Sequence, residues 1–126
     1  MSQHESFAGR QFYHGTSLEN ADGILAEGEK MFPGVMGKGF YITDSPALAG
    51  RYAEYASGRR LREGGTAVIL RGEVHPEAPA DHDDFSPVTN REDLSMYNGI
   101  GVVRRPGVFH PTHISGDKPG TWVPLR

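Results

Sequence analysis

The 126-residue chain contains no cysteine, no long apolar run and no excess of positive charge. Without cysteine there is no disulfide, no thiolate zinc site and no cysteine nucleophile. No stretch approaches the roughly 18 apolar residues that a membrane span needs, and residues 1–10 lack the apolar run of a signal peptide. We therefore expect a cytoplasmic protein without a membrane partner.

The sequence also lacks the signatures of several common nucleotide-binding and hydrolytic folds. It has no P-loop, no GxGxxG segment and no serine nucleophile elbow, which excludes a dinucleotide site built on a Rossmann unit. The formal net charge is −3, so there is no general electrostatic attraction to nucleic acid as an obligatory partner.

Side chains of the types that bind metals occur in two places, but neither has the pattern of a metal site. His75 and Asp81–Asp84 stand in an acidic, proline-containing stretch that we expect to be a surface loop. His110 and His113 are separated by Pro111, which prevents the helix that would align them. We predict that no metal is bound.

Length and composition predict one soluble globular domain over residues 1–126, with residues 1–10 flexible. Strands are predicted at 11–14, 39–43, 66–74, 100–103, 108–110 and 121–123, with a long loop at 75–93. Because strands outnumber helices and lie mostly next to one another in the second half, we expect an α+β fold with mixed or antiparallel sheets.

Two helices are predicted in the first half, each with a cap at its start and a glycine after its end. The first begins with a capping box of Thr16 and Glu19, and Gly28 ends it. The second is capped by Ser45 and ends at Gly58. Helical spacing predicts the inward-facing residues as Leu18, Ala21 and Leu25 in the first helix, and Leu48, Tyr52 and Tyr55 or Ala56 in the second.

Two segments suggest a binding site for a flat molecule. In the first, with the sequence YHGT, His14 ends a strand, and Gly15 has no side chain to shield its backbone from a planar ligand. In the second, with the sequence GFYIT, Tyr41 ends a strand, and Tyr52 lies two turns into the helix that follows. A strand and a helix folded back on it can place two rings on either side of a flat group.

Together these segments resemble the NAD⁺ sites of ADP-ribosyltransferases of the His-Tyr-Glu class, especially the diphtheria toxin and exotoxin A type. In that pattern a Tyr-His-Gly-Thr strand is followed by a helix, then by Gly-Phe-Tyr and a helix with a second tyrosine. The separation of eleven residues between Tyr41 and Tyr52 matches it, and the Gly-Phe-Tyr-Ile and Pro-Ala-Leu-Ala pieces are similar to those of exotoxin A. The resemblance covers about residues 11–57, less than half of the chain.

The resemblance implies a compact domain in which two small sheets and short helices surround an NAD⁺ cleft. His14 would hydrogen-bond a ribose hydroxyl, the Gly15 backbone would pair with the nicotinamide carboxamide, and Thr16 would belong to the same cofactor site. Tyr41 and Tyr52 would sandwich the nicotinamide ring. The implied function is mono-ADP-ribosyl transfer from NAD⁺ as co-substrate, with NAD⁺ hydrolysis when no acceptor is bound. The acceptor stays open among proteins, nucleic acids and small molecules.

The sequence departs from the family pattern at the third catalytic element. The family has a glutamate on a late strand, whose carboxylate stabilises the cationic transition state. Three alignments place Asn98, Gly99 or Ile100 at this position, and none supplies a carboxylate. We assign Asn98 to it, as a catalytic residue without charge. The nearby carboxylates are Glu92, Asp93 and Asp117.

Two alternatives to the transferase stay open at this point. One is a protein that keeps the nucleotide pocket but has lost catalysis. The other is an enzyme that uses the same pocket for different chemistry on a nucleotide or a flat small molecule. Nicotinamide release on incubation with NAD⁺ separates the first from the transferase, and a pocket that rejects NAD⁺ would indicate the second.

Overall fold

The computed structural model describes residues 4–6, 11–34, 37–58, 66–74, 79–81, 94–97, 99–104, 107–116, 118 and 120–125. Within these ranges the chain forms two helices, α1 (Leu18–Glu27) and α2 (Pro46–Ser57). The strands, in chain order, are β1 (His4–Ser6), β2 (Phe12–Ser17), β3 (Phe40–Thr43), β4 (Ala67–Val74), β5 (Pro79–Asp81), β6 (Leu94–Tyr97), β7 (Ile100–Val103), β8 (Phe109–Ser115) and β9 (Trp122–Pro124). No helix in the described ranges is both long and apolar enough to cross a membrane.

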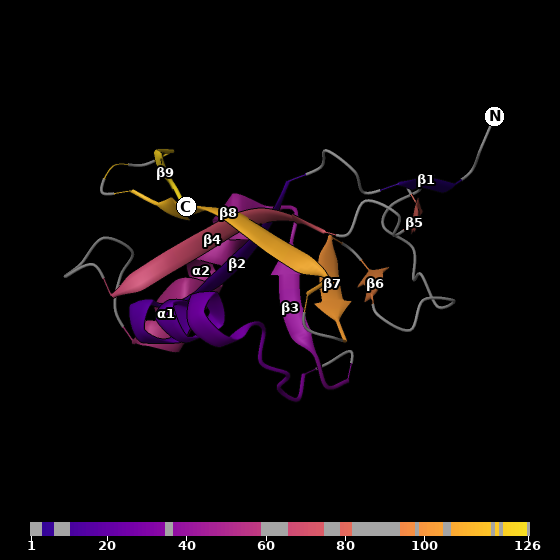
Figure 1. Ribbon diagram of the computed structural model, residues 1–126, viewed down its shortest axis with the longest axis horizontal. Coiled ribbons are helices and arrows are strands. Elements are labelled where there is room, and N and C mark those ends of the chain that lie inside the picture. Colours follow the sequence, from indigo (N-terminus) through magenta and orange to yellow (C-terminus); the bar gives the residue numbers. More distant parts are fainter. Residues whose placement is uncertain are drawn as a thin grey trace.

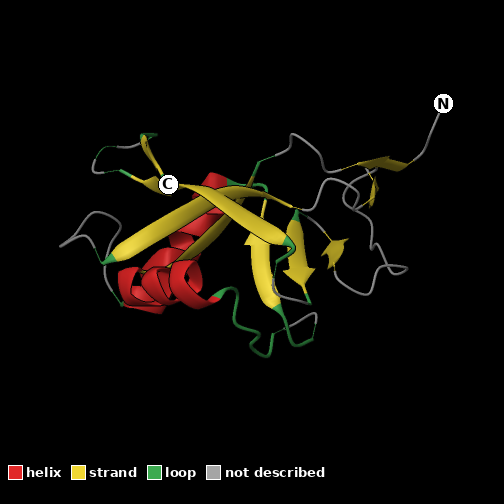
Figure 2. Ribbon diagram, in the orientation of Figure 1, coloured by secondary structure: helices red, strands yellow, loops and turns green. Residues whose placement is uncertain are grey.

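Seven strands form one sheet in the order β6-β7-β3-β2-β4-β8-β9, and β1 and β5 form a separate pair (Figure 1). All pairings in the described part of the chain are antiparallel. Both helices lie beside the β2–β4 region of this sheet (Figure 2). The predicted α+β architecture is therefore confirmed.

The large sheet is split between β2 and β3. These two strands share a single partner pair, Tyr13 with Thr43, whereas β2 and β4 are paired along the whole of β2. In Figure 1, β3 and β7 accordingly run in a different direction from β4 and β8. The two small sheets that the resemblance implies are therefore not found as separate sheets: β6-β7-β3 and β2-β4-β8-β9 belong to one sheet and are joined at one point.

The two helices cover opposite faces of the β2-β4-β8-β9 half. Ile24 of α1 belongs to the cluster that contains Leu70, and Ala53 of α2 belongs to a second cluster that contains Ile69. Successive residues of a strand point to opposite faces, so Ile69 and Leu70 contact different helices. The apolar core is therefore divided into two layers by the sheet.

Helix α2 packs on the sheet through its smallest residues. Ala49, Gly50 and Ala53 are buried, and a Cβ atom built on Gly15 would lie 1.7 Å from the carbonyl oxygen of Ala49. The helix therefore approaches the strand so closely that a larger side chain does not fit between them. This contact decides which face of α2 points away from the sheet.

The predicted inward face of α2 is wrong for this reason. Tyr52 is 41% exposed and Tyr55 is 91% exposed, so neither ring is a core residue. The inward face predicted for α1 is wrong at Leu18 and Leu25, which are 40% and 43% exposed, although Ala21 is buried as expected. In α2, apolar periodicity favoured the large side chains, whereas close packing buried the small ones.

The helix ends are predicted better than the helix faces. Gly28, Ser45 and Gly58 cap the helices as expected. The start of α1 differs, because its N-cap is Ser17, whose hydroxyl accepts a hydrogen bond from the Asn20 amide. Thr16 is instead a buried residue of β2, which extends three residues beyond the predicted strand.

The later strands agree with the prediction in place, but some differ in length. β4 and β7 lie at the expected residues, while β8 is longer and β9 is shifted by one residue. β6 is absent from the prediction, although Asn98-Gly99, which stands between the paired residues Tyr97 and Ile100, is a strong hairpin signal. Most of the predicted 75–93 loop lies outside the described residues.

The contact between α2 and β2 predicts a difference between two glycine-to-alanine variants. Gly15→Ala should lower the free energy of unfolding by about 3 kcal/mol, because its methyl group meets the backbone of α2. Gly23→Ala in α1 is the matched control, since an added Cβ meets only Lys30 Nζ at 3.8 Å. It should stabilise the protein by roughly 0.5–1 kcal/mol through helix propensity. Urea unfolding measures the free energy of unfolding of both variants. Equal values for the two variants would contradict the close contact between α2 and β2.

Candidate functional site

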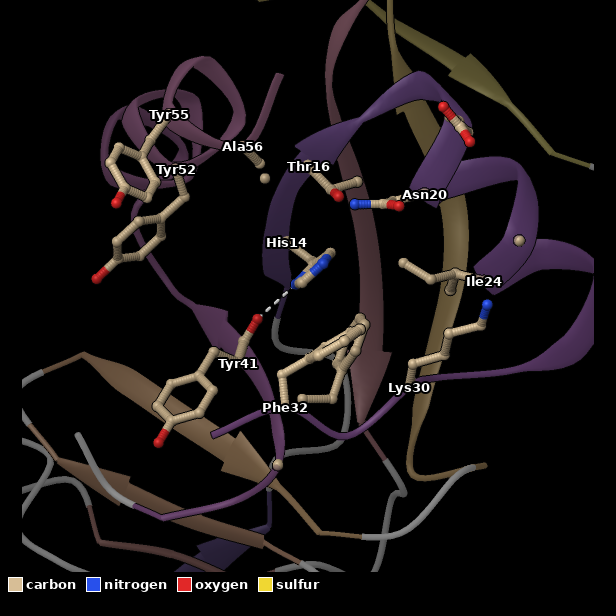
Figure 3. A pocket seen from close by; sticks show the side chains of 15 residues that line it. His14, Thr16, Asn20, Ile24, Lys30, Phe32, Tyr41, Tyr52, Tyr55 and Ala56 are labelled. Carbon is tan, nitrogen blue, oxygen red and sulfur yellow. Dashed lines mark hydrogen bonds between the residues drawn. The ribbon is translucent and has the colours of Figure 1, made fainter. Parts of the chain in front are cut away.

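A pocket with a volume of about 470 Å³ lies where the sheet splits (Figure 3). This volume lies in the range of small-molecule sites. Side chains from β2, β3, both helices and the segment between α1 and β3 line it. The lining includes the predicted site residues His14, Gly15, Thr16, Tyr41 and Tyr52. The sixth, Asn98, lies outside the described residues.

The pocket has an aromatic end and a polar end. Tyr41, Tyr52 and Tyr55 lie together on one side, whereas Asn20 and Lys30 lie across the pocket from them (Figure 3). The aromatic side therefore suits a flat ring, and the polar side suits a hydrogen-bonding or anionic group.

The His14 side chain occupies the gap between β2 and β3. Its Nδ1 lies 2.5 Å from the carbonyl oxygen of Tyr41, and its ring stacks on Phe40 with the centroids 3.9 Å apart. A carbonyl oxygen only accepts hydrogen bonds, so Nδ1 is the donor. One side chain thus bridges the two half-sheets just beyond their single backbone pair.

This bridge leaves the Gly15 amide facing the pocket. The Leu18 amide donates to Thr66 at 2.8 Å, so by alternation the even-numbered residues of β2 direct their backbone groups to β4. Gly15 therefore directs its N–H and C=O to the other edge, where the register would place it opposite Tyr41. Among the described residues no strand pair forms there, and His14 takes the Tyr41 carbonyl instead.

The electrostatic state of His14 follows from its surroundings. Desolvation by burial lowers the pKa of His14 from 6.5 to about 4, and the hydrogen bond to Tyr41 offsets this only in part. The imidazole is therefore neutral at pH 7. With its proton on Nδ1, the ring presents Nε2 as a hydrogen-bond acceptor.

Tyr41 is held in place by the segment that precedes β3. Its hydroxyl donates to the Gly37 carbonyl at 2.6 Å, and a Cβ on Gly34 would lie 2.5 Å from its ring. Phe32 and Gly39 exchange two backbone hydrogen bonds of 2.9 Å and close this segment at its base. The ring is thus fixed before any ligand arrives, which limits the entropy cost of stacking.

Lys30 and Glu19 are the charged residues among the described pocket lining. Lys30 contacts Glu27 at 3.5 Å, but both side chains are more than half exposed, so this ion pair is weak. Glu19 lies in the first turn of α1, next to the cap that Ser17 provides. Three lining residues were not predicted from the sequence, because none belongs to a recognisable motif: Lys30, Phe32 and Tyr55.

The start of β7 shows which alignment could hold a carboxylate. Gly99 is buried with φ +76°, and a Cβ on it would lie 2.8 Å from Asp44 Oδ1. A glutamate at residue 99 would therefore be strained and would meet another carboxylate. Ile100 pairs with Thr43, and Thr43 shares its face of β3 with Tyr41. Three other candidates lie outside the described residues: Glu92, Asp93 and Asp117.

The chain matches no protein-family model, no curated protein and no solved structure. Within the part of the chain that the structure describes, no group of three or more His, Asp or Glu side chains could hold a metal ion.

The low pKa of His14 predicts a pH dependence of stability. The unfolded chain binds a proton near pH 6.5, whereas the folded protein binds it only near pH 4, so stability is full above about pH 6.5 and falls toward pH 4. The loss should be at most about 3 kcal/mol. His14→Gln should flatten this part of the profile, while His110→Gln, at an exposed position, should leave it unchanged. Unfolding free energies between pH 4 and 8 test this, and identical profiles for all three proteins would contradict it.

Proposed function

We propose that the protein binds NAD⁺ in this pocket and transfers one ADP-ribosyl group to an acceptor, with hydrolysis of NAD⁺ when no acceptor is present. The observation that carries the proposal is the Gly15 amide at the open edge of β2, in a pocket that Tyr41 and Tyr52 also line. A primary carboxamide has one acceptor oxygen and N–H donors, which match the N–H and C=O of a single residue.

The aromatic end of the pocket supports a nicotinamide ring. The Tyr41 ring is held by the hydrogen bond from its hydroxyl to the Gly37 carbonyl. The Tyr52 ring is accessible because α2 packs on the sheet through its small residues. A flat heteroaromatic ring between two such rings gains stacking energy without a large ordering cost. The carboxamide of the same ring would then reach Gly15.

The other groups of the pocket match the rest of the dinucleotide. The neutral His14 has Nε2 available to accept a hydrogen bond from a hydroxyl of the nicotinamide ribose. Lys30, on the polar side, supplies a cation for the pyrophosphate (Figure 3). Protonation of His14 would turn Nε2 from an acceptor into a donor. The low pKa of His14 keeps the ring neutral at pH 7, which favours a hydrogen bond from the ribose hydroxyl to Nε2.

The chemistry that follows is a substitution at C1′ of the nicotinamide ribose. The C1′–N1 bond breaks, and its electron pair leaves with nicotinamide, which becomes neutral. The ribose carries positive charge in the transition state until the acceptor attacks C1′ and loses its proton. Stacking and hydrogen bonds orient this reaction, whereas a negative group near the ribose would accelerate it.

A second candidate function is NAD⁺ binding without cleavage. It is favoured by Gly99, because its φ of +76° would strain a glutamate and a Cβ there would lie 2.8 Å from Asp44 Oδ1. Glu19 is the one carboxylate among the described lining residues, and it belongs to α1 rather than to β7. Nicotinamide release distinguishes the two functions, because both require NAD⁺ binding but only the transferase breaks the glycosidic bond.

We expect millimolar NAD⁺ to raise the melting temperature, because a ligand that binds only the folded state stabilises it. Tyr52→Ala should weaken NAD⁺ binding by about 1–3 kcal/mol, and Tyr52→Phe should retain most of the affinity because it keeps the ring. Leu25→Ala is the matched control, since Leu25 is similarly exposed at 43% and lies outside the pocket lining. Calorimetric titration measures each affinity.

No melting shift with folded protein would overturn the cofactor assignment. A Phe variant as weak as the Ala variant would show instead that the Tyr52 hydroxyl matters, and the stacking arrangement would be wrong.

A carboxylate introduced at the start of β7 should increase turnover. Ile100→Glu should raise nicotinamide release by about a hundredfold, equivalent to about 3 kcal/mol of transition-state stabilisation. Ile100→Gln is the matched control without charge, and Asn98→Glu tests the alignment assigned from the sequence. Gly99→Glu should mainly destabilise the fold. If the variants at residues 98 and 100 fold, bind NAD⁺ and keep the natural rate, no carboxylate from this strand reaches the ribose.

A further inference from the structure

The exposed aromatic side chains of the described residues gather at one place. The large hydrophobic side chains that are exposed include three aromatics, Phe32 at 60%, Tyr52 at 41% and Tyr55 at 91%, and all three line the pocket. Single exposed apolar residues are common, but a cluster around a pocket marks a binding surface. Nicotinamide stacking accounts for Tyr52 alone.

We infer that Tyr55 is a stacking platform for an unpaired nucleobase, so that the acceptor of the ADP-ribosyl group is single-stranded nucleic acid. This inference rests on the proposed function and names its acceptor. Tyr55 lies one turn after Tyr52, next to it at the aromatic end of the pocket (Figure 3). A ring stacked on Tyr55 would therefore lie beside the nicotinamide end of NAD⁺.

Tyr55 has no packing role that explains its position. It is almost fully exposed, and it belongs to neither core cluster. Its hydroxyl and ring face open solvent at the rim, so the whole ring surface is available to a ligand. A nearly bare tyrosine ring is the typical means by which proteins hold single-stranded bases, since every base has a flat face that can stack.

Arg51 supplies the charge that a nucleic acid needs. It is exposed and precedes Tyr55 by four residues in α2, so the two side chains lie on the same side of the helix. A cation beside an aromatic platform fits a strand whose phosphate follows the stacked base. The net charge of −3 gives no long-range attraction, so stacking carries the affinity. Binding should accordingly depend weakly on salt.

The transfer to a base is a balanced substitution. The exocyclic amino nitrogen of the base forms a bond to C1′ of the nicotinamide ribose as the C1′–N1 bond breaks. The electron pair of that bond leaves with neutral nicotinamide, and the base nitrogen releases one proton to solvent. No oxidant, reductant or metal takes part. A base in a duplex is stacked between its neighbours and cannot lie on Tyr55 without being extruded.

The test measures binding of labelled oligonucleotides of roughly ten nucleotides by fluorescence anisotropy, with the full chain and saturating NAD⁺. Single-stranded DNA and single-stranded RNA are compared with the matching duplexes. Tyr55→Ala should weaken single-strand binding about tenfold, and Tyr55→Phe should retain it. Val123→Ala, at a 52% exposed residue of β9 outside the pocket lining, should change nothing.

Turnover and cofactor affinity complete the test. Tyr55→Ala should reduce ADP-ribose transfer to the oligonucleotide about tenfold more than it reduces nicotinamide release in water. Duplexes that bind as well as single strands, or single-strand binding that Tyr55→Ala leaves intact, would overturn the inference. An equal loss of NAD⁺ affinity would assign Tyr55 to the cofactor instead. If the natural protein does not bind NAD⁺, the proposed function fails, while anisotropy without NAD⁺ still decides whether Tyr55 holds a base.

Discussion

The hydrogen bond from His14 Nδ1 to the Tyr41 carbonyl is the interaction on which the site depends. It replaces a backbone bond that would otherwise close the sheet, so the two half-sheets stay connected while their edges remain apart. An open strand edge inside a domain would normally leave polar groups without partners. Here the imidazole donates to the β3 edge at Tyr41, and the β2 edge at Gly15 is left facing the pocket. The opening is therefore part of the fold and does not need to be created on binding.

The second constraint is the close packing of α2 on β2. The absence of a side chain at Gly15 brings the helix down onto the strand, and Ala49 and Ala53 are the residues small enough to fill the contact. This seating turns Tyr52 and Tyr55 away from the core and toward the pocket. Gly15 thus has two functions: it seats the helix with one face, and it presents its amide at the strand edge. A single residue couples the position of the tyrosines to the position of the polar groups.

Local signals predicted the elements of this chain well, and tertiary packing decided what those signals could not. The ends of α2 could be predicted from Ser45 and Gly58, because a capping residue bonds backbone groups within one turn of itself. The inward face was predicted wrongly at Leu18 and Leu25 of α1 and at the tyrosines of α2, since periodicity does not show how close a helix lies to its sheet. Five of the six residues predicted for the site line one pocket, because the motifs that contain them stand on neighbouring elements, and their roles stay predictions. Either Tyr55 or Ala56 was predicted to lie inward, and the 91% exposure of Tyr55 is what shows that its ring is accessible.

The second half of the chain is less predictable for a different physical reason. Tyr97-Asn98-Gly99 can be aligned with a catalytic motif, yet Asn-Gly between paired strands is also the preferred sequence of a tight hairpin. The positive φ of Gly99 suits the hairpin and would strain a glutamate at that position. Under the proposed function, stacking and hydrogen bonds to the nicotinamide end would hold the ground state and the transition state about equally, whereas charge near the ribose would favour the transition state. The proposed binding and the proposed turnover would therefore be separable in this fold. Stacking and hydrogen bonds where β2 and β3 part would determine the affinity for NAD⁺, and the charge next to the ribose would determine the rate of its cleavage.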